Sequence, residues 1–343
     1  MDPTAKRRIG RTALEATALG FGGAPLGGFR ATIPEAEAQA ILDAAWEGGV
    51  RLFDTSPFYG HGRSELRFGH ALRQRPRDQY ILSTKIGRVM HAARPGEAPP
   101  AGMRPNGLPG FLPRFDYTYD GVMRSLEQSH LRLGLDRIDV VLIHDIDLWS
   151  VGDPDVLEDR FRTAMDGGYR ALHELREQGV IGAIGCGLND AGMCLRFARA
   201  GDFDCMLLAG RYTLLEQGAM AAFLPYCAER GMSVILGGPF NSGILAAEVK
   251  DSATYDYATA PPAVVAKARR IEAVCRRHDT PLPAAALQFV LAHPVVCSVI
   301  PGALARSEIE ANIAHLRRPI PAALWHDLKA EGLLDPAAPV PGG

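Results

Sequence analysis

Four residues of different chemical types, Asp54, Tyr59, Lys85 and His144, could share one catalytic site. Three of them directly follow apolar runs typical of buried strands: VRLF, YILST and VVLI. Tyr59 lies in the turn-rich loop TSPFYGHG after Asp54. Because a tyrosine has an ordinary pKa near 10, it needs help to act as a base near neutral pH. A neighbouring lysine ammonium would favour the phenolate, and an aspartate could hold that ammonium in place. A histidine could donate a hydrogen bond to a substrate oxygen.

Such a set moves a proton on or off an alcohol or carbonyl oxygen. No protein side chain moves a hydride, so the pattern predicts a nicotinamide cofactor. Each residue alone is weak evidence, because a single histidine, lysine or tyrosine more often has a structural or solvated role. Their joint occurrence at successive strand ends favours an active site. A metal hydrolase would need more ligands than Asp54 and His144, so no metal site is predicted.

Strand-like and helix-like segments alternate along the chain. Strands are predicted at residues 18–21, 50–54, 80–84, 138–143, 180–184, 203–208, 232–236 and 295–300. Helices are predicted at 34–46, 64–72, 119–133, 162–177, 191–200, 216–229, 263–277, 282–292, 307–316 and 322–331. Eight such units favour a (β/α)8 TIM barrel over a doubly wound sheet. We expect one domain over residues 1–343, with an N-terminal β-hairpin at 7–20 and an extra C-terminal helix.

Residues 86–119 interrupt this alternation with many prolines and glycines, and residues 146–161 form a second polar segment. A long loop inside a compact domain is more often functional than accidental, so we expect a functional role for the first segment, with a surface insertion as the alternative. The run Gly185-Cys186-Gly187 resembles the start of a dinucleotide-binding fingerprint. Asp190 stands where its third glycine would be, and no acidic residue ends a strand about 20 residues later, so a Rossmann loop is not predicted.

The composition is that of an ordinary globular protein, with 47% hydrophobic and 22% charged residues and a net charge of −2. This charge gives no reason to expect nucleic acid or an anionic membrane as a partner. The six cysteines form no CxxC pair, and no stretch has the ~18 uninterrupted apolar residues of a membrane span. We therefore expect a cytoplasmic protein whose partner is a small-molecule substrate.

The chain resembles the aldo-keto reductase family over nearly its whole length. The resemblance is carried by RRIGRTALEATALGFGG, FDTSPFYG, STK, LIHD, IGCGLN, GGPFNSGIL and VIPGALARSEIEANI. It implies that Tyr59 is the proton donor or acceptor, that Lys85 and Asp54 tune it, and that His144 orients the substrate.

The resemblance also implies a cofactor site at the barrel mouth. Its residues would be Gly23, Asn189, Gly238, Pro239, Phe240, Asn241, Ser242, Gly243, Leu245, Ile300, Gly302, Glu308 and Asn312. Asn189 would bind the nicotinamide carboxamide, and the segment 239–245 the pyrophosphate. Glu308 stands where NADP-binding relatives have basic residues, and a carboxylate repels a 2′-phosphate but accepts hydrogen bonds from a diol. We therefore expect NAD rather than NADP, although Arg306 keeps NADP as an alternative.

Several phrases, including FDYTYDGVMRSLEQS and DFDCMLLAGRYTLLEQ, are similar to the group of D-threo-aldose 1-dehydrogenases, L-fucose and L-galactose dehydrogenases, and pyridoxal 4-dehydrogenases. The resemblance implies oxidation of a cyclic hemiacetal to a lactone. We favour an aldose such as L-fucose as substrate, with pyridoxal as the alternative. A generic NAD(P)H-dependent carbonyl reductase and a non-catalytic cofactor sensor are two further alternatives. Polar and aromatic candidates for substrate contacts are Asp116, Tyr117, Tyr119, Phe111 and Trp149.

Overall fold

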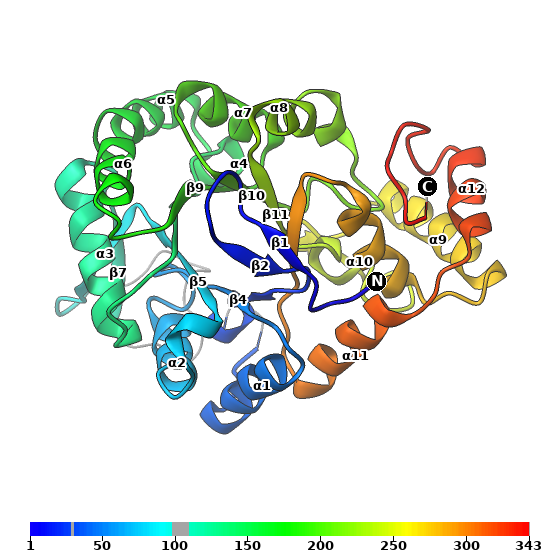
Figure 1. Cartoon of the computed structure of the whole chain (residues 1–343), viewed down its shortest axis with the longest axis horizontal. Helices are drawn as coiled ribbons and strands as arrows, with labels where there is room; N and C mark the ends of the chain where they lie inside the picture. Colours follow the sequence, from blue (N-terminus) through cyan, green and yellow to red (C-terminus); the bar gives the residue numbers. More distant parts are fainter. Residues whose placement is uncertain (29–30, 98–109, 343) are drawn as a thin grey trace.

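The computed structural model describes residues 1–28, 31–97 and 110–342, and their strands form an eight-stranded parallel barrel (Figure 1). The strands are β3 (Phe21–Gly22), β4 (Leu52–Asp54), β5 (Ile81–Ile86), β8 (Val140–His144), β9 (Ala183–Leu188), β10 (Cys205–Ala209), β11 (Ser233–Gly237) and β14 (Val296–Ile300). They pair in the order β14-β11-β10-β9-β8-β5-β4-β3. A parallel bridge between Leu19 and Val299 joins the first strand to the last and closes the barrel, as predicted.

Helices surround the barrel (Figure 1). They are α1 (Glu35–Glu47), α2 (Arg63–Leu72), α3 (Tyr119–Leu133), α4 (Leu148–Val151), α5 (Pro154–Thr163), α6 (Arg170–Glu177), α7 (Ala191–Ala200), α8 (Phe223–Arg230), α9 (Pro262–Arg277), α10 (Leu282–Ala292), α11 (Arg306–Arg317) and the predicted extra helix α12 (Ala322–Ala330). Local signals set their ends: the Thr118 side chain accepts a hydrogen bond from Gly121 N at the start of α3, and Gly134 ends it in the left-handed conformation.

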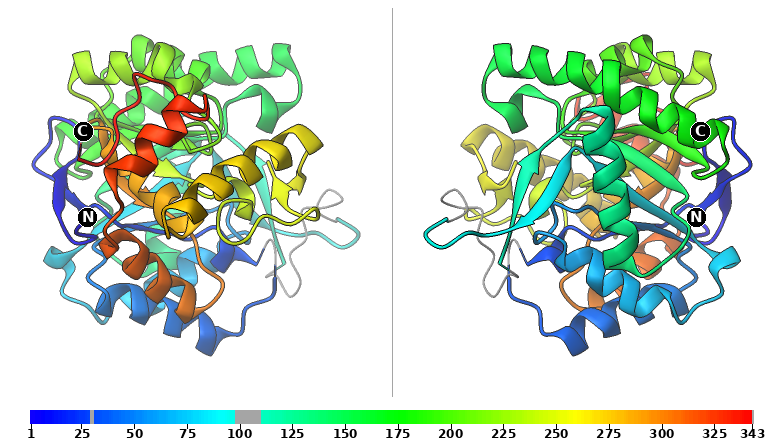
Figure 2. Two further views of the ribbon diagram at one scale, coloured as in Figure 1. Left: turned by 90° about the vertical axis from the view of Figure 1, so that its right-hand side faces the viewer. Right: turned by 90° about the vertical axis from the view of Figure 1, so that its left-hand side faces the viewer.

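The N-terminal hairpin closes one end of the barrel. It consists of β1 (Lys6–Arg8) and β2 (Glu15–Thr17), which pair antiparallel. Its Ile9 and Ala16 are fully buried and pack in one cluster with inward-facing strand residues such as Val140. The predicted hairpin is therefore present, and it fills the barrel interior from the end opposite the strand tips. Figure 2 shows this hairpin at the opposite end of the molecule from a second hairpin, formed by β6 (Arg88–Ala92) and β7 (Phe111–Phe115).

Both predicted polar loops contain regular structure, which corrects the sequence prediction. In the first, β6 (Arg88–Ala92) and β7 (Phe111–Phe115) pair antiparallel, while residues 98–109 lie outside the described part. The second contains α4 and α5, whose starts are capped by the side chains of Asp147 and Asp153. Neither helix buries a residue, so neither has the apolar periodicity from which helices are predicted.

A third difference concerns the glycine pair at residues 185 and 187. We expected the strand to end at Ile184, but β9 runs through both glycines to Leu188. A Cβ on Gly185 would lie 2.2 Å from the main-chain oxygen of Cys205 on the neighbouring strand. Gly185 therefore allows close strand packing, and a Cβ on Gly187 would lie 3.3 Å from Lys85 Cε. Both glycines belong to the strand, so they do not form a phosphate-binding turn.

No helix within residues 1–28, 31–97 and 110–342 has both the length and the apolar character needed to cross a bilayer.

Candidate active site

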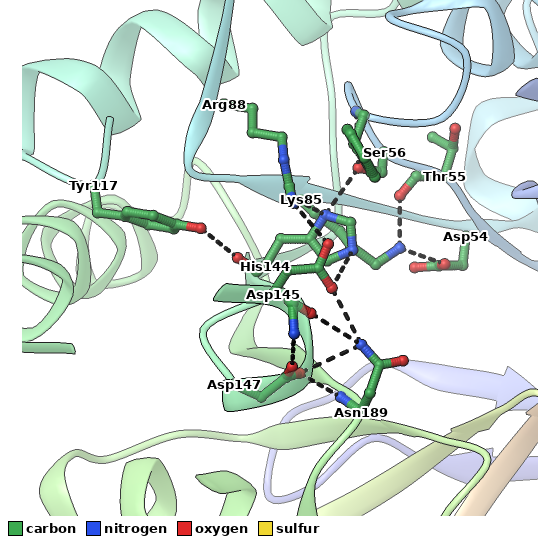
Figure 3. Close-up of polar contacts among 12 residues, drawn as sticks. Asp54, Thr55, Ser56, Lys85, Arg88, Tyr117, His144, Asp145, Asp147 and Asn189 are labelled. Atoms are coloured by element: carbon green, nitrogen blue, oxygen red, sulfur yellow. Dashed lines mark hydrogen bonds and ion pairs between the residues drawn. The ribbon is translucent and has the colours of Figure 1, made fainter. Parts of the chain in front are cut away.

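A buried ion pair lies where β4 and β5 end. Lys85 Nζ donates to Asp54 Oδ2 at 2.6 Å and to the main-chain oxygen of Thr55 at 2.8 Å (Figure 3). Ser83, which pairs with Asp54 in the sheet register, donates its hydroxyl to Asp54 Oδ1 at 2.8 Å. Burial raises the pKa of Asp54, and the Lys85 charge opposes this rise. Parallel pairing of two strands thus fixes one ammonium group at the barrel mouth.

Tyr59 is held over this ion pair by its loop. Lys85 Nζ lies 4.6 Å from the centre of the Tyr59 ring, and the His144 imidazole meets the same ring edge-on at 5.8 Å. The loop approaches the main chain of Gly27 so closely that a Cβ on Gly60 would lie 2.2 Å from Gly27 O. The structure therefore brings together the four predicted catalytic residues, although Tyr59 is 26 residues from Lys85 and 85 from His144 in the sequence.

The pKa of Tyr59 differs from the expectation based on sequence. Burial, together with the negative charges of Asp54 and Asp145, raises the pKa of Tyr59 well above its ordinary value. We expected Lys85 to lower it, but the carboxylate of Asp54 lies 2.6 Å from the Lys85 ammonium and offsets that charge. Tyr59 is consequently protonated in the free protein.

His144, the last residue of β8, is held from three sides. Its Nδ1 lies 3.1 Å from Ser56 Oγ and 3.0 Å from Arg88 Nη1, and its main-chain oxygen accepts the Tyr117 hydroxyl at 2.7 Å (Figure 3). Burial, followed by the positive charges of Arg88 and Lys85, lowers the pKa of His144 well below its ordinary value. The imidazole is therefore neutral at neutral pH.

Two charged residues of the site, Arg88 and Asp145, were missed by the sequence analysis. Arg88 is only 4% exposed and donates to Asp145 Oδ2 at 2.8 Å. Asp145 has a φ of +53°, a backbone conformation uncommon for residues other than glycine. Arg88 lies in a segment predicted as an irregular loop, so its sequence position gave no reason to place it beside a strand end. The motif LIHD did contain Asp145, directly after His144.

Asn189 follows β9 and lies beside these charges. Its main-chain N–H donates to Asp147 Oδ2 at 2.8 Å, and its side-chain Nδ2 lies 3.4 Å from Asp145 Oδ1. Arg211 Nε donates to the main-chain oxygen of Asn189 at 2.9 Å. The residue expected to bind the nicotinamide carboxamide is thus connected through Asp145 to the residues around His144.

The segment after β11 makes a tight turn. Its residues with positive φ are Gly238, Asn241, Ser242 and Gly243. The Asn241 side chain is buried, accepting from Thr213 Oγ1 at 2.5 Å and donating to Gly210 O at 2.9 Å. The Ser242 hydroxyl accepts from Tyr257 N at 3.0 Å. In the free structure the Asn241 side chain therefore holds the turn against the β10 end, which leaves the main chain of the turn as the part suited to a cofactor.

Of the other predicted cofactor residues, most are buried or close-packed, and Glu308 is exposed. Pro239, Leu245, Ile300 and Asn312 have buried side chains, Phe240 is half-buried, and Gly23 and Gly302 lie in close-packed main chain. A Cβ on Gly302 would lie 2.4 Å from Pro25 Cγ. Glu308 is exposed in the first turn of α11, where its carboxylate accepts from Leu304 N at 2.9 Å. Among the described residues, no three histidine, cysteine or acidic side chains are grouped so as to hold a metal ion.

Comparisons with known proteins agree with this geometry. Residues 18–330 match the model of the Aldo/keto reductase family. The chain is 42% identical to pyridoxal 4-dehydrogenase of Microbacterium luteolum, covering 96% of this chain and 98% of that protein. It is 40% identical to D-threo-aldose 1-dehydrogenase of a Pseudomonas species, covering 93% and 94%. The holo structure of an aldo-keto reductase from Bacillus halodurans superposes with a TM-score of 0.73 at 24% identity, covering 98% of each chain.

Proposed function

The chain belongs to the aldo/keto reductase family of oxidoreductases, and on that premise we propose that it is an NAD-dependent dehydrogenase of cyclic hemiacetals. The substrate is an aldose such as L-fucose, oxidised at C1 to the lactone. One observation carries the proposal: Tyr59 lies between the Asp54–Lys85 ion pair and the His144 imidazole at the barrel mouth.

The residues divide the reaction among them. The nicotinamide cofactor, when bound, would supply the hydride-accepting chemistry for the carbon that bears the hemiacetal hydroxyl. Tyr59, as phenolate, takes the proton of that hydroxyl, so the C–O bond becomes the lactone carbonyl. Lys85, held by Asp54, places positive charge beside the phenolate. His144 orients the reacting oxygen through a ring nitrogen.

The charges near α11 support NAD over NADP. A 2′-phosphate would require an available cation, and the candidate at the start of α11, Arg306, is already paired with two carboxylates. Its Nε donates to Glu310 at 2.8 Å and its Nη2 to Glu47 at 3.2 Å. Glu308 adds a further negative charge at the same helix start. An NADP phosphate would therefore meet three carboxylates and an arginine that is already paired.

The choice between aldose and pyridoxal rests on two relatives of nearly equal identity, whose names give one substrate each. Both compounds can form a cyclic hemiacetal, so the same reaction serves either. The relative named L-galactose dehydrogenase, from Arabidopsis thaliana at 29% identity, adds support for a sugar.

The test is NADH formation with L-fucose, D-arabinose, L-galactose and pyridoxal, using NAD and then NADP. We expect NADH with a sugar and a loss of about 10²–10⁴-fold in kcat for Tyr59→Phe. Tyr226→Phe is the matched control, because that hydroxyl lies on α8, where it donates to Ala198 O at 3.5 Å. Activity with pyridoxal alone would replace the sugar by pyridoxal. No NADH with any of the four compounds would contradict the proposal.

A second function, NAD(P)H-dependent reduction of aldehydes or ketones, is favoured by one observation. The raised pKa of Tyr59 keeps its proton available, as a proton donor to a carbonyl oxygen requires. NADH consumption with small aldehydes, together with no oxidation of hemiacetals, would favour this function.

A further inference from the structure

The imidazole of His144 has two ring nitrogens with different surroundings. Nδ1 lies 3.0 Å from Arg88 Nη1 and 3.1 Å from Ser56 Oγ. Nε2 lies 3.4 Å from Asp145 Oδ1. A neutral imidazole carries one proton, and these neighbours decide which nitrogen holds it.

The Arg88 guanidinium group determines whether Nδ1 carries a proton. Arginine has five N–H donors and no acceptor, so Nδ1 can bond to Arg88 only with its lone pair. The Ser56 hydroxyl can donate or accept, and it therefore adapts to either form of the ring. On the other side, an ionised Asp145 carboxylate only accepts, so it favours a proton on Nε2. Both neighbours place the proton on Nε2.

We propose that Arg88 is a positioning residue that locks His144 in the Nε2–H form, so that His144 acts on the substrate as a hydrogen-bond donor. Without this lock, part of the histidine would carry its proton on Nδ1, and Nε2 would present a lone pair to the substrate oxygen. This inference rests on the proposed function only for the identity of that oxygen.

The surroundings of Arg88 hold its guanidinium rigidly. Asp145 accepts from its Nη2 at 2.8 Å, and the guanidinium carbon lies 4.0 Å from the Phe58 ring centre and 4.8 Å from that of Phe115. Because Asp145 also contacts Asn189 Nδ2 at 3.4 Å, one carboxylate joins the histidine lock to the proposed carboxamide-binding residue (Figure 3). A side chain with 4% exposure and these contacts has little freedom to leave Nδ1.

The direct test is the position of the His144 proton, read from long-range ¹H–¹⁵N correlation spectra of the full-length protein labelled at its ten histidines. The His144→Asn spectrum identifies the resonances of His144 by their loss. In the wild-type protein at mildly alkaline pH, we expect an unprotonated Nδ1 and a protonated Nε2. A proton on Nδ1 in the wild-type protein would overturn the proposal without the use of any variant of Arg88.

Variants then test whether Arg88 is the cause. Arg88→Met should give a mixture of the two proton positions and lower kcat by about tenfold or more. Arg88→Lys should restore the wild-type proton position and part of kcat, because an ammonium group also has donors only. Arg160→Met is the matched control, since Arg160 lies 3.9 Å from the Phe115 ring and has no contact with His144. It should leave both the spectrum and kcat unchanged.

Two results would refute a role for Arg88: a wild-type proton position in folded Arg88→Met, or an equal loss of kcat in Arg160→Met. If Arg88→Met does not fold, the wild-type and Arg88→Lys spectra decide. Should the wild-type protein oxidise no hemiacetal, the proposed function fails, while the spectra still decide where the His144 proton lies.

Discussion

Replacing Lys85 with methionine should destabilise the protein in a way that depends on pH. The Lys85 ammonium and the Asp54 carboxylate are 1% and 2% exposed and 2.6 Å apart. At an effective dielectric constant of about 20, their attraction is about 6 kcal/mol, much of which offsets the cost of burying both charges. Breaking such a pair by removing one partner costs about 3–5 kcal/mol. We expect a loss of this size for Lys85→Met at neutral pH.

The sign of the pH dependence of stability follows from the Asp54 carboxyl, which remains buried when Lys85 is replaced. Burial already raises the pKa of Asp54, and Lys85→Met removes the charge that opposes this rise. A buried carboxyl with a raised pKa is tolerated while protonated, so its contribution to stability is present at low pH. That contribution is lost as pH increases from the ordinary range of an unfolded aspartate through the raised pKa of the folded state. The deficit of Lys85→Met relative to the wild type should therefore grow with pH.

Urea denaturation followed by circular dichroism, at about pH 5 and about pH 8, measures this effect. The double variant Lys85→Met/Asp54→Asn is the control, because it removes both charges while an amide can still accept from Ser83. At about pH 8 the double variant should recover much of the free energy of unfolding that Lys85→Met loses. This site should then contribute no pH dependence to its stability. The reasoning is wrong if the deficit of Lys85→Met is equal at both pH values, or if the double variant is less stable than Lys85→Met at about pH 8.

Three other predictions concern catalysis and cofactor choice. Gly27→Ala should displace the Tyr59 loop, because the new Cβ would lie 2.6 Å from Tyr59 C, and kcat should fall at least tenfold. Gly218→Ala is the control, because a Cβ there would meet no atom within 4 Å among the described residues, and it should leave steady-state kinetics unchanged. The raised pKa of Tyr59 should make hemiacetal oxidation increase with pH and carbonyl reduction decrease, and parallel pH profiles in both directions would contradict this assignment. Glu308→Arg should raise the ratio of kcat/KM for NADP to kcat/KM for NAD by about tenfold or more. The control is Glu229→Arg, at an exposed position on α8, which makes the same charge change and should leave this ratio unchanged.

The barrel and the grouping of the four catalytic residues could be predicted because each strand, and the polar residue after it, is marked by a short stretch of consecutive residues. Apolar runs marked the strands, and the residue after each run had to lie at the same end of a parallel barrel. Lys85 and His144 could thus be placed together without knowledge of any long-range contact. Their pKa values could not be predicted, because they depend on burial and on distances between strands, as the raised pKa of Tyr59 demonstrates.

Arg88 was missed because its position depends on a hairpin that the sequence does not indicate. Segment 86–119 has turn residues throughout, and its two strands pair across residues that lie far apart in the chain. Similarly, α5 has no fully buried residue, since Leu157 and Phe161 are only partly buried against the core, and its clearest sequence signals are the cap at Asp153 and Pro154. In both cases the sequence lacks the apolar periodicity from which elements are predicted, and the structure depends on hydrogen bonds and on packing against the barrel.

The hairpin that closes the barrel also sets an order of events during synthesis. Arg7, in that hairpin's first strand, donates to the main-chain oxygens of Leu291 and Val296 at 2.9 and 2.8 Å. At the usual rates of about 5–20 residues per second, the ribosome needs about 15 to 60 s to reach these partners. The hairpin's own pairing can form early, but the contacts of Arg7 with Leu291 and Val296 cannot form until most of the chain has been synthesised. Until β14 has been synthesised, the barrel cannot close at β3, and an unpaired strand edge is a site at which chains aggregate.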